Sequence, residues 1–330
     1  MKKLLGLILV IAMVLSMGLS ATAEEGLKVA VVLSGATGDR SFYDSANEGL
    51  QALVASDLGI QGTLIECKND ASMFTTNLIA AAEDNDVVIA VGWEFWDALT
   101  EYAPQLPDTK FIFIDNGLDG VGDNLMSITY AQNEGSFLVG YIAGKLTQTG
   151  KIGAVGGEDR ETINDFIVGY RAGAEYAREG CEVQVQYAGT YDDPAKGKEL
   201  ALALYDAGCD IVFQVASRTG EGVFEAAAER GLYAIGVDSD QKYINPDVIL
   251  CSMIKQVNLS IEQAVTAYAT EGTWMGGQIW VADMATGLID VGYGDDTMTQ
   301  QVSDELKAEV EEIKAQIIAG EIEVPTAFVG

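Results

Sequence analysis

Three charged side chains stand where a binding site could form. Asp115 and Asp238 each follow a short apolar run, and Lys255 closes the run that begins at Ile249. Polar residues that follow the strands of an open α/β sheet gather at its carboxyl edge, where ligands bind. A carboxylate and an ammonium group there can form charge-assisted hydrogen bonds to the hydroxyl groups of a ligand. The alternatives are a structural hinge ion pair for Asp238 and Lys255 and a turn cap for Asp115.

Two aromatic residues are candidates for stacking on a ligand. Phe42 and Tyr191 each lie in a loop where an apolar ring has no obvious core to fill. Two such rings from opposite halves of the chain could enclose a planar base, and stacking contributes about 1–3 kcal/mol per base. Loop packing is the alternative. Trp93 and Gln214 are further candidates for the cleft, although the Gln214 amide could equally cap backbone groups. Trp96 is assigned to the core.

The composition excludes several kinds of chemistry. Histidine is absent from the 330 residues, so a Ser-His-Asp triad, a Cys-His dyad or an imidazole metal site cannot form. The four cysteines are widely spaced and form no CxxC pair, which argues against a zinc site and a thioredoxin-type motif. The formal net charge of −31 opposes binding to nucleic-acid phosphates. We therefore expect no metal, no cofactor and no nucleic-acid partner.

The loop after the first predicted strand, Val29 to Leu33, does not suit a dinucleotide. Gly35 and Gly38 lack the G-x-G-x-x-G spacing, and Asp39 places an anion where a phosphate needs a hydrogen-bond donor. Dinucleotide binding is disfavoured by this loop.

The middle of the chain indicates how the polar residues are positioned. Asp193 followed by Pro194 is typical of a helix start, since the aspartate caps a free N–H group and proline suits the first helical position. Ile211–Val215 and Tyr233–Val237 are short apolar runs without alternation, as expected of parallel strands that helices cover on both faces. The second run leads directly into Asp238. Repeated strand-helix units of this kind predict an α/β fold.

The chain begins with the pattern of a secretory signal peptide. Lys2 and Lys3 precede an apolar segment, and Ala21-Thr22-Ala23 follows as a cleavage site. A retained membrane anchor is the alternative.

The rest of the chain contains the strand-helix order twice. The order restarts near Lys151, which predicts two similar lobes joined by several crossings. The predicted parts are residues 1–23 as signal peptide, 24–131 plus 256–288 as the first lobe, and 132–255 plus 289–330 as the second.

Several segments, in chain order, resemble one known family. They are NEGSFLVGYIAGKL (133–146), DDPAKGKELA (192–201), GEGVFEAA (220–227), YAIGVDSDQ (233–241) and SMIK (252–255). They are similar to signature segments of the basic membrane protein family, the substrate-binding proteins of bacterial nucleoside importers. The resemblance implies the type I periplasmic-binding-protein fold: two doubly wound α/β lobes joined by a hinge.

The resemblance also implies roles for particular residues. In the family, the positions of Asp115, Asp238 and Lys255 contact a ribose. Nucleoside-binding relatives carry an acidic residue soon after the first strand that recognises the base edge, whereas this chain has Ser34 to Gly38 there, so that Asp39 is the candidate. Many relatives are lipoproteins with a cysteine just after the apolar segment, but the first cysteine of this chain is Cys67.

The resulting hypothesis is an exported, monomeric binding protein rather than an enzyme. It captures a nucleoside, expected to be a purine nucleoside, in the periplasm or at the outer face of the cell membrane and delivers it to an ABC permease. The permease is its only expected link to the membrane. The alternatives are a protein of the same fold for a flavin, a sugar or a signalling molecule, and a nucleoside-processing enzyme. A DNA-binding repressor is excluded, because the signal peptide occupies the place of a helix-turn-helix.

The signal-peptide hypothesis predicts a defined mature protein. Cleavage after Ala23 leaves Glu24 as the first residue, and the intact mass of the protein purified from its host measures this. A protein that is uncleaved or carries a lipid contradicts the hypothesis.

Overall fold

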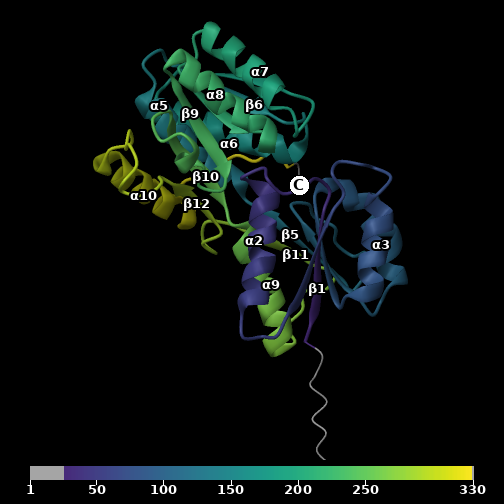
Figure 1. Ribbon diagram of the computed structural model, residues 1–330. Coiled ribbons are helices and arrows are strands. Elements are labelled where there is room, and N and C mark those ends of the chain that lie inside the picture. Colours follow the sequence, from purple (N-terminus) through teal and green to yellow (C-terminus); the bar gives the residue numbers. More distant parts are fainter. Residues whose placement is uncertain (1–25, 329–330) are drawn as a thin grey trace, which may run out of the picture.

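The computed structural model describes residues 26–328, so the predicted signal peptide lies outside the described part. The described residues form two α/β lobes, one above the other in Figure 1, and each lobe is built on a six-stranded sheet. The predicted fold class is confirmed. In the part of the chain that the structure covers, no helix combines the length and apolar character needed to cross a membrane.

The first lobe has an entirely parallel sheet with the strand order β11-β5-β4-β3-β1-β2. Its strands are β1 (Lys28–Leu33), β2 (Gln61–Glu66), β3 (Val87–Val91), β4 (Lys110–Ile114), β5 (Leu125–Tyr130) and β11 (Ile279–Ala282). Its helices are α2 (Phe42–Ala55), α3 (Phe74–Asp84), α4 (Trp96–Tyr102) and α9 (Val257–Glu271), with short 3-10 turns at Trp93–Phe95 and Ala103–Gln105.

The second lobe repeats the order as β12-β10-β9-β8-β6-β7, with β12 antiparallel to β10. Its strands are β6 (Lys151–Gly156), β7 (Glu182–Tyr187), β8 (Ile211–Val215), β9 (Tyr233–Asp238), β10 (Ile249–Lys255) and β12 (Ile289–Gly292). Its helices are α5 (Gln132–Leu146), α6 (Glu161–Ala177), α7 (Pro194–Asp206), α8 (Glu221–Arg230) and α10 (Asp304–Ile318), with 3-10 turns at Ser217–Gly220 and Lys242–Ile244.

The central strands have the apolar character that their burial requires. All five residues of β3 and of β8 are buried, because helices cover both faces of each sheet. The sequence predicted β8 with its observed bounds. The edge strands β2 and β7 are partly exposed and carry polar residues. The predicted cap is also confirmed: the Asp193 side chain accepts a hydrogen bond from the backbone N–H of Lys196 at the start of α7.

The chain passes between the two sheets more than once. It leaves the first sheet after β5 and returns to it at β11, which precedes β12 of the second sheet. Helices α2 and α9 pack together although they are far apart in sequence (Figure 1). Several connecting segments therefore lie between the lobes, and these restrict the relative movement of the lobes to a hinge.

Helices α5 and α6 of the second lobe approach each other through glycines. A Cβ atom on Gly173 would lie 1.9 Å from the carbonyl oxygen of Phe137, and one on Gly140 would lie 2.2 Å from that of Tyr170. These distances are far below van der Waals contact, so only glycine fits at either position.

We expect Gly173→Ala to destabilise the protein. Helix propensity alone favours alanine over glycine by about 1 kcal/mol, but overpacking against backbone costs about 1–3 kcal/mol or more. Urea unfolding should show a lower free energy of unfolding than wild type. An increase equal to the propensity gain contradicts the close approach of the two helices.

Candidate binding site

The carboxyl edges of the two sheets face each other and enclose a cavity. The space between its lining atoms, including the part open to solvent, is about 670 Å³. The cavity is lined by residues that follow β1, β3 and β4 of the first lobe and by residues at or after the carboxyl ends of β6 to β10 of the second. The structure brings together six of the eight predicted site residues in its wall: Phe42, Trp93, Asp115, Tyr191, Asp238 and Lys255.

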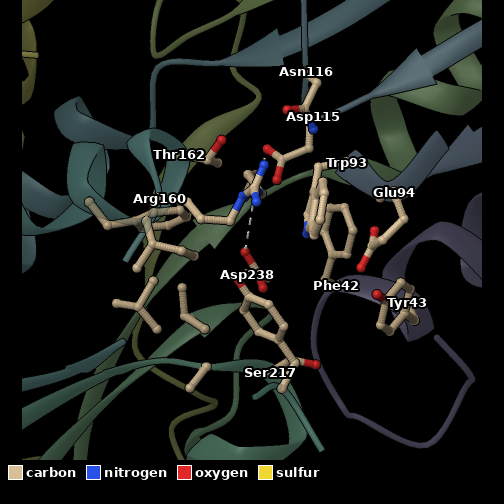
Figure 2. Close-up of a pocket in the computed structure, with 18 residues that line it drawn as sticks. Phe42, Tyr43, Trp93, Glu94, Asp115, Asn116, Arg160, Thr162, Ser217 and Asp238 are labelled. Carbon is tan, nitrogen blue, oxygen red and sulfur yellow. Dashed lines mark hydrogen bonds and ion pairs between the residues drawn. The ribbon is translucent and has the colours of Figure 1, made fainter. Parts of the chain in front are cut away.

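A buried ion-pair cluster lies at the centre of the cavity wall. The Lys255 Nζ atom is 2.8 Å from Asp115 Oδ1 and 3.8 Å from Asp238 Oδ1. Burial raises the pKa of Asp115, and the ammonium group of Lys255 opposes this rise. Asp115 belongs to the first lobe and Lys255 to the second, so the pair joins the two lobes. Figure 2 shows the Asp115 and Asp238 side chains pointing toward each other across the cavity.

Asp238 has one carboxylate oxygen that could accept a hydrogen bond. Its Oδ2 atom accepts a bond of 2.7 Å from the Ser41 hydroxyl of the other lobe. Within residues 26–328, its Oδ1 atom has no hydrogen-bond partner. The backbones of Asp115 and Asp238 have φ angles of 72° and 64°, a left-handed conformation that is uncommon outside glycine. Local strain of this kind costs about 1–3 kcal/mol per residue and concentrates at functional sites.

Aromatic rings surround the ion pair. The Lys255 Nζ atom is 5.0 Å from the ring centre of Phe42 and 5.1 Å from those of Tyr130 and Phe166. Phe42 belongs to the first lobe. Tyr191 belongs to the second lobe and lines the cavity from the loop after β7. Its ring lies against the backbone at Gly157, where a Cβ atom would be 2.1 Å from the ring. The cavity therefore has aromatic walls from both lobes.

Sequence reasoning missed several residues of the cavity wall. Arg160 follows β6, and its guanidinium carbon lies 3.5 Å from the ring centre of Trp93. Glu94 follows β3 and reaches the cavity beside Tyr43 (Figure 2). Their positions in the sequence could have indicated them, because Glu94 and Arg160 each come shortly after a short apolar run, β3 and β6 respectively. Whether a loop side chain turns into the cavity depends on its backbone conformation, which the residue types do not specify.

Asp39 was predicted to meet the ligand but does not lie in the cavity wall. Its buried carboxylate accepts hydrogen bonds from the backbone N–H groups of Ser41, Tyr43 and Asp44 at the start of α2. It also accepts a bond of 2.8 Å from the Ser217 hydroxyl of the other lobe. Asp39 therefore caps a helix and links the lobes, because the turn after Gly38 directs its side chain toward its own helix.

Two further assignments require correction. Gln214 is fully buried outside the cavity wall, donates to Gln241 Oε1 at 2.7 Å and accepts from the backbone N–H of Ala216. Both ends of the Gln214 amide therefore have hydrogen-bond partners within the protein, and the alternative interpretation of Gln214 as a capping amide applies. Trp96 was assigned to the core, but 40% of it is exposed. Trp96 begins α4, rests edge-on against Phe113 and lines a second, open hollow that also includes Asp115 and Asn116.

Two doubly wound lobes with a cavity between the carboxyl edges of their sheets define a type I periplasmic solute-binding protein. Residues 27–327 match the family described as "ABC transporter substrate-binding protein PnrA-like". The chain belongs to this family, which confirms the predicted resemblance. Proteins of this family are solute-binding proteins that act outside the cytoplasm, where they supply a small-molecule ligand to an ABC permease.

Relatives and solved structures agree with this assignment. The chain is 33% identical to the "ABC transporter nucleoside-binding protein BmpA" of Lactococcus lactis subsp. cremoris, with 94% of this chain and 92% of the relative covered. It is 33% identical to "Basic membrane protein A2" of Borrelia garinii subsp. bavariensis, covering 98% and 96%. A solute-binding protein structure from Aeropyrum pernix K1 superposes with a TM-score of 0.80 at 26% identity, covering 91% of this chain and 94% of that one.

The buried carboxyl of Asp39 makes stability depend on pH. Burial raises the pKa of Asp39 from 3.8 to about 6, against the lowering effect of its hydrogen bonds. The folded protein therefore binds this proton more tightly than the unfolded chain does. The contribution of this bound proton to the stability of the folded protein is complete below pH 3.8 and is lost as the pH rises through about 6.

We expect the free energy of unfolding of wild type, relative to Asp39→Asn, to increase when the pH falls from about 7.5 to about 4. The increase should reach at most roughly 3 kcal/mol, from about 1.36 kcal/mol per pKa unit. Urea unfolding of both proteins at several pH values measures it, and titrations of other groups cancel in the difference. The raised pKa of Asp39 is contradicted if the difference in free energy of unfolding between wild type and Asp39→Asn is constant with pH or shrinks at low pH.

Proposed function

We propose that this protein binds a purine nucleoside between its lobes and delivers it to an ABC importer. The observation that carries the proposal is the Asp115-Lys255-Asp238 cluster beside aromatic walls from both lobes. The protein from Lactococcus lactis with which it shares 33% identity is described as nucleoside-binding. A nucleoside has one part that suits each feature: a sugar with neighbouring hydroxyl groups and a planar base.

The charged cluster suits the ribose. The Asp238 Oδ1 atom is a buried acceptor without a hydrogen-bond partner in the described chain, and it lies 3.8 Å from the ammonium group of Lys255. A carboxylate can accept bonds from two adjacent hydroxyl groups, and Lys255 can donate to them. Hydrogen bonds to charged groups contribute about 1.5–3 kcal/mol each. This end of the cavity thus favours a ligand with vicinal hydroxyl groups.

The aromatic walls suit the base. Phe42 stands at the start of α2 in the first lobe and Tyr191 in the second, so a base between them contacts both lobes at once. A ligand that contacts both lobes favours the closed arrangement over an open one. Capture outside the cytoplasm follows from the proposed export of the chain and places the closed, loaded protein where a permease can receive it.

We expect Asp238→Ala to weaken nucleoside binding by roughly 10- to 100-fold, since about 1.4 kcal/mol corresponds to tenfold. A free base has no ribose hydroxyl groups, so any affinity for hypoxanthine or guanine should change little. Titration calorimetry with inosine, guanosine and the two bases measures both effects.

Asp238→Asn keeps the shape of the side chain and tests the charge if the alanine variant does not fold. Asp206→Ala removes an exposed carboxylate that pairs with Arg230, far from the cavity, and should bind like wild type. Equal losses for nucleoside and base would place Asp238 in hinge structure. If wild type binds no nucleoside, the proposed function is wrong.

A further inference from the structure

A second buried acceptor lies in the cavity, away from the charged cluster. Glu94 belongs to the 3-10 turn that follows β3, and its Oε2 atom is inaccessible to solvent. Among the residues that the structure describes, no hydrogen-bond donor reaches this atom. In the view of Figure 2, Glu94 and Tyr43 lie on one side of the Phe42 ring and Asp115 lies on the other. The cavity thus carries acceptors at both of its ends.

The backbone beside Glu94 is shaped around its carboxylate. Gly92 has a φ angle of 118°, which favours glycine. A Cβ atom at this position would lie 2.6 Å from Glu94 Oε2 and 2.1 Å from Ser34 Oγ. Burial raises the pKa of Glu94, and the nearby Glu94 backbone N–H group and Ser34 hydroxyl group oppose this rise. A donor on a ligand would lower that pKa further, because it stabilises the ionised carboxylate.

A hydroxyl group accompanies this carboxylate. The Tyr43 hydroxyl is 2.9 Å from the Ser34 hydroxyl, and either can be the donor. Burial, followed by the charge of Glu94, raises the pKa of Tyr43, so the phenol stays neutral. Ser34 has one hydroxyl proton, so the phenol proton is available for an acceptor on the ligand when Ser34 donates to Tyr43 and not to Glu94. This end of the cavity therefore presents one strong acceptor and one donor.

We infer that Glu94, assisted by Tyr43, selects purine bases that carry an N1–H group beside a C6 carbonyl, namely guanine and hypoxanthine. The inference rests on the nucleoside function proposed above. With the sugar at Asp115 and Asp238, a base that stacks on Phe42 extends toward Glu94. The N1–H group, and in guanine also the exocyclic amine, donates to the carboxylate, while Tyr43 donates to the carbonyl. Adenine in the same orientation presents an N1 lone pair to the Glu94 carboxylate and a C6 amine to the Tyr43 hydroxyl, so the carboxylate faces a second acceptor and the phenol proton faces a donor.

The test is the ratio of affinities for guanosine and adenosine, measured by titration calorimetry. Wild type should bind guanosine and inosine at least about tenfold more tightly than adenosine. It should also bind guanosine more tightly than 1-methylguanosine, in which a methyl group replaces the N1 proton. Glu94→Gln, whose amide can donate to the adenine N1, should reduce the guanosine-to-adenosine ratio by about 10- to 100-fold. Tyr43→Phe should weaken guanosine and inosine binding without improving adenosine binding.

The control is Glu66→Gln. Glu66 ends β2 in the same lobe and accepts hydrogen bonds from Thr37 outside the cavity wall, so this variant should keep the wild-type ratio. If wild type binds nucleosides but Glu94→Gln leaves the ratio unchanged, the role of Glu94 is refuted while the proposed function stands. Equal wild-type affinities for guanosine and adenosine refute it in the same way. Failure of wild type to bind any nucleoside overturns the proposed function, and the assignment of Glu94 with it.

Discussion

The ammonium group of Lys255 is the charge on which the arrangement of the site depends. The residue is 2% exposed, and removing an ion from water costs several kcal/mol unless other charges compensate. Asp115 compensates it directly at 2.8 Å, Asp238 contributes at 3.8 Å, and three aromatic rings within 5.1 Å face the cation. Because Asp115 and Lys255 belong to different lobes, this compensation requires that the lobes lie together.

The same region contains other bonds between the lobes. Ser41 of the first lobe donates to Asp238 of the second, and Gln241 of the second donates to the backbone carbonyl of Arg40 at 3.0 Å. Gln214 holds the side chain of Gln241, so a residue outside the cavity wall still orients a contact between the lobes. The contacts that close the lobes and the walls of the cavity thus share residues, which couples closure to the occupation of the cavity by a ligand.

The sequence by itself determined the fold and part of the site. Strands that helices cover on both faces must be apolar along their length, so β3, β4 and β8 stand out as continuous runs. The side chain that follows such a strand lies at the carboxyl edge whatever the neighbouring lobe does. For this reason the positions of Asp115, Asp238 and Lys255 along the chain place each of them at the carboxyl edge of a sheet, and the packing of the two lobes then brings them to one cavity.

The tertiary structure decided the direction of the loop side chains. Asp39 turns back onto its own helix and Gln214 turns into the protein, whereas Glu94 and Arg160 enter the cavity. All four lie at or shortly after the carboxyl end of a strand, so position along the chain does not separate them. Their directions depend on backbone angles and on partners from the other lobe, such as Ser217 for Asp39 and Trp93 for Arg160. Contacts between residues far apart in sequence set these directions, and residue types and spacing do not encode them locally.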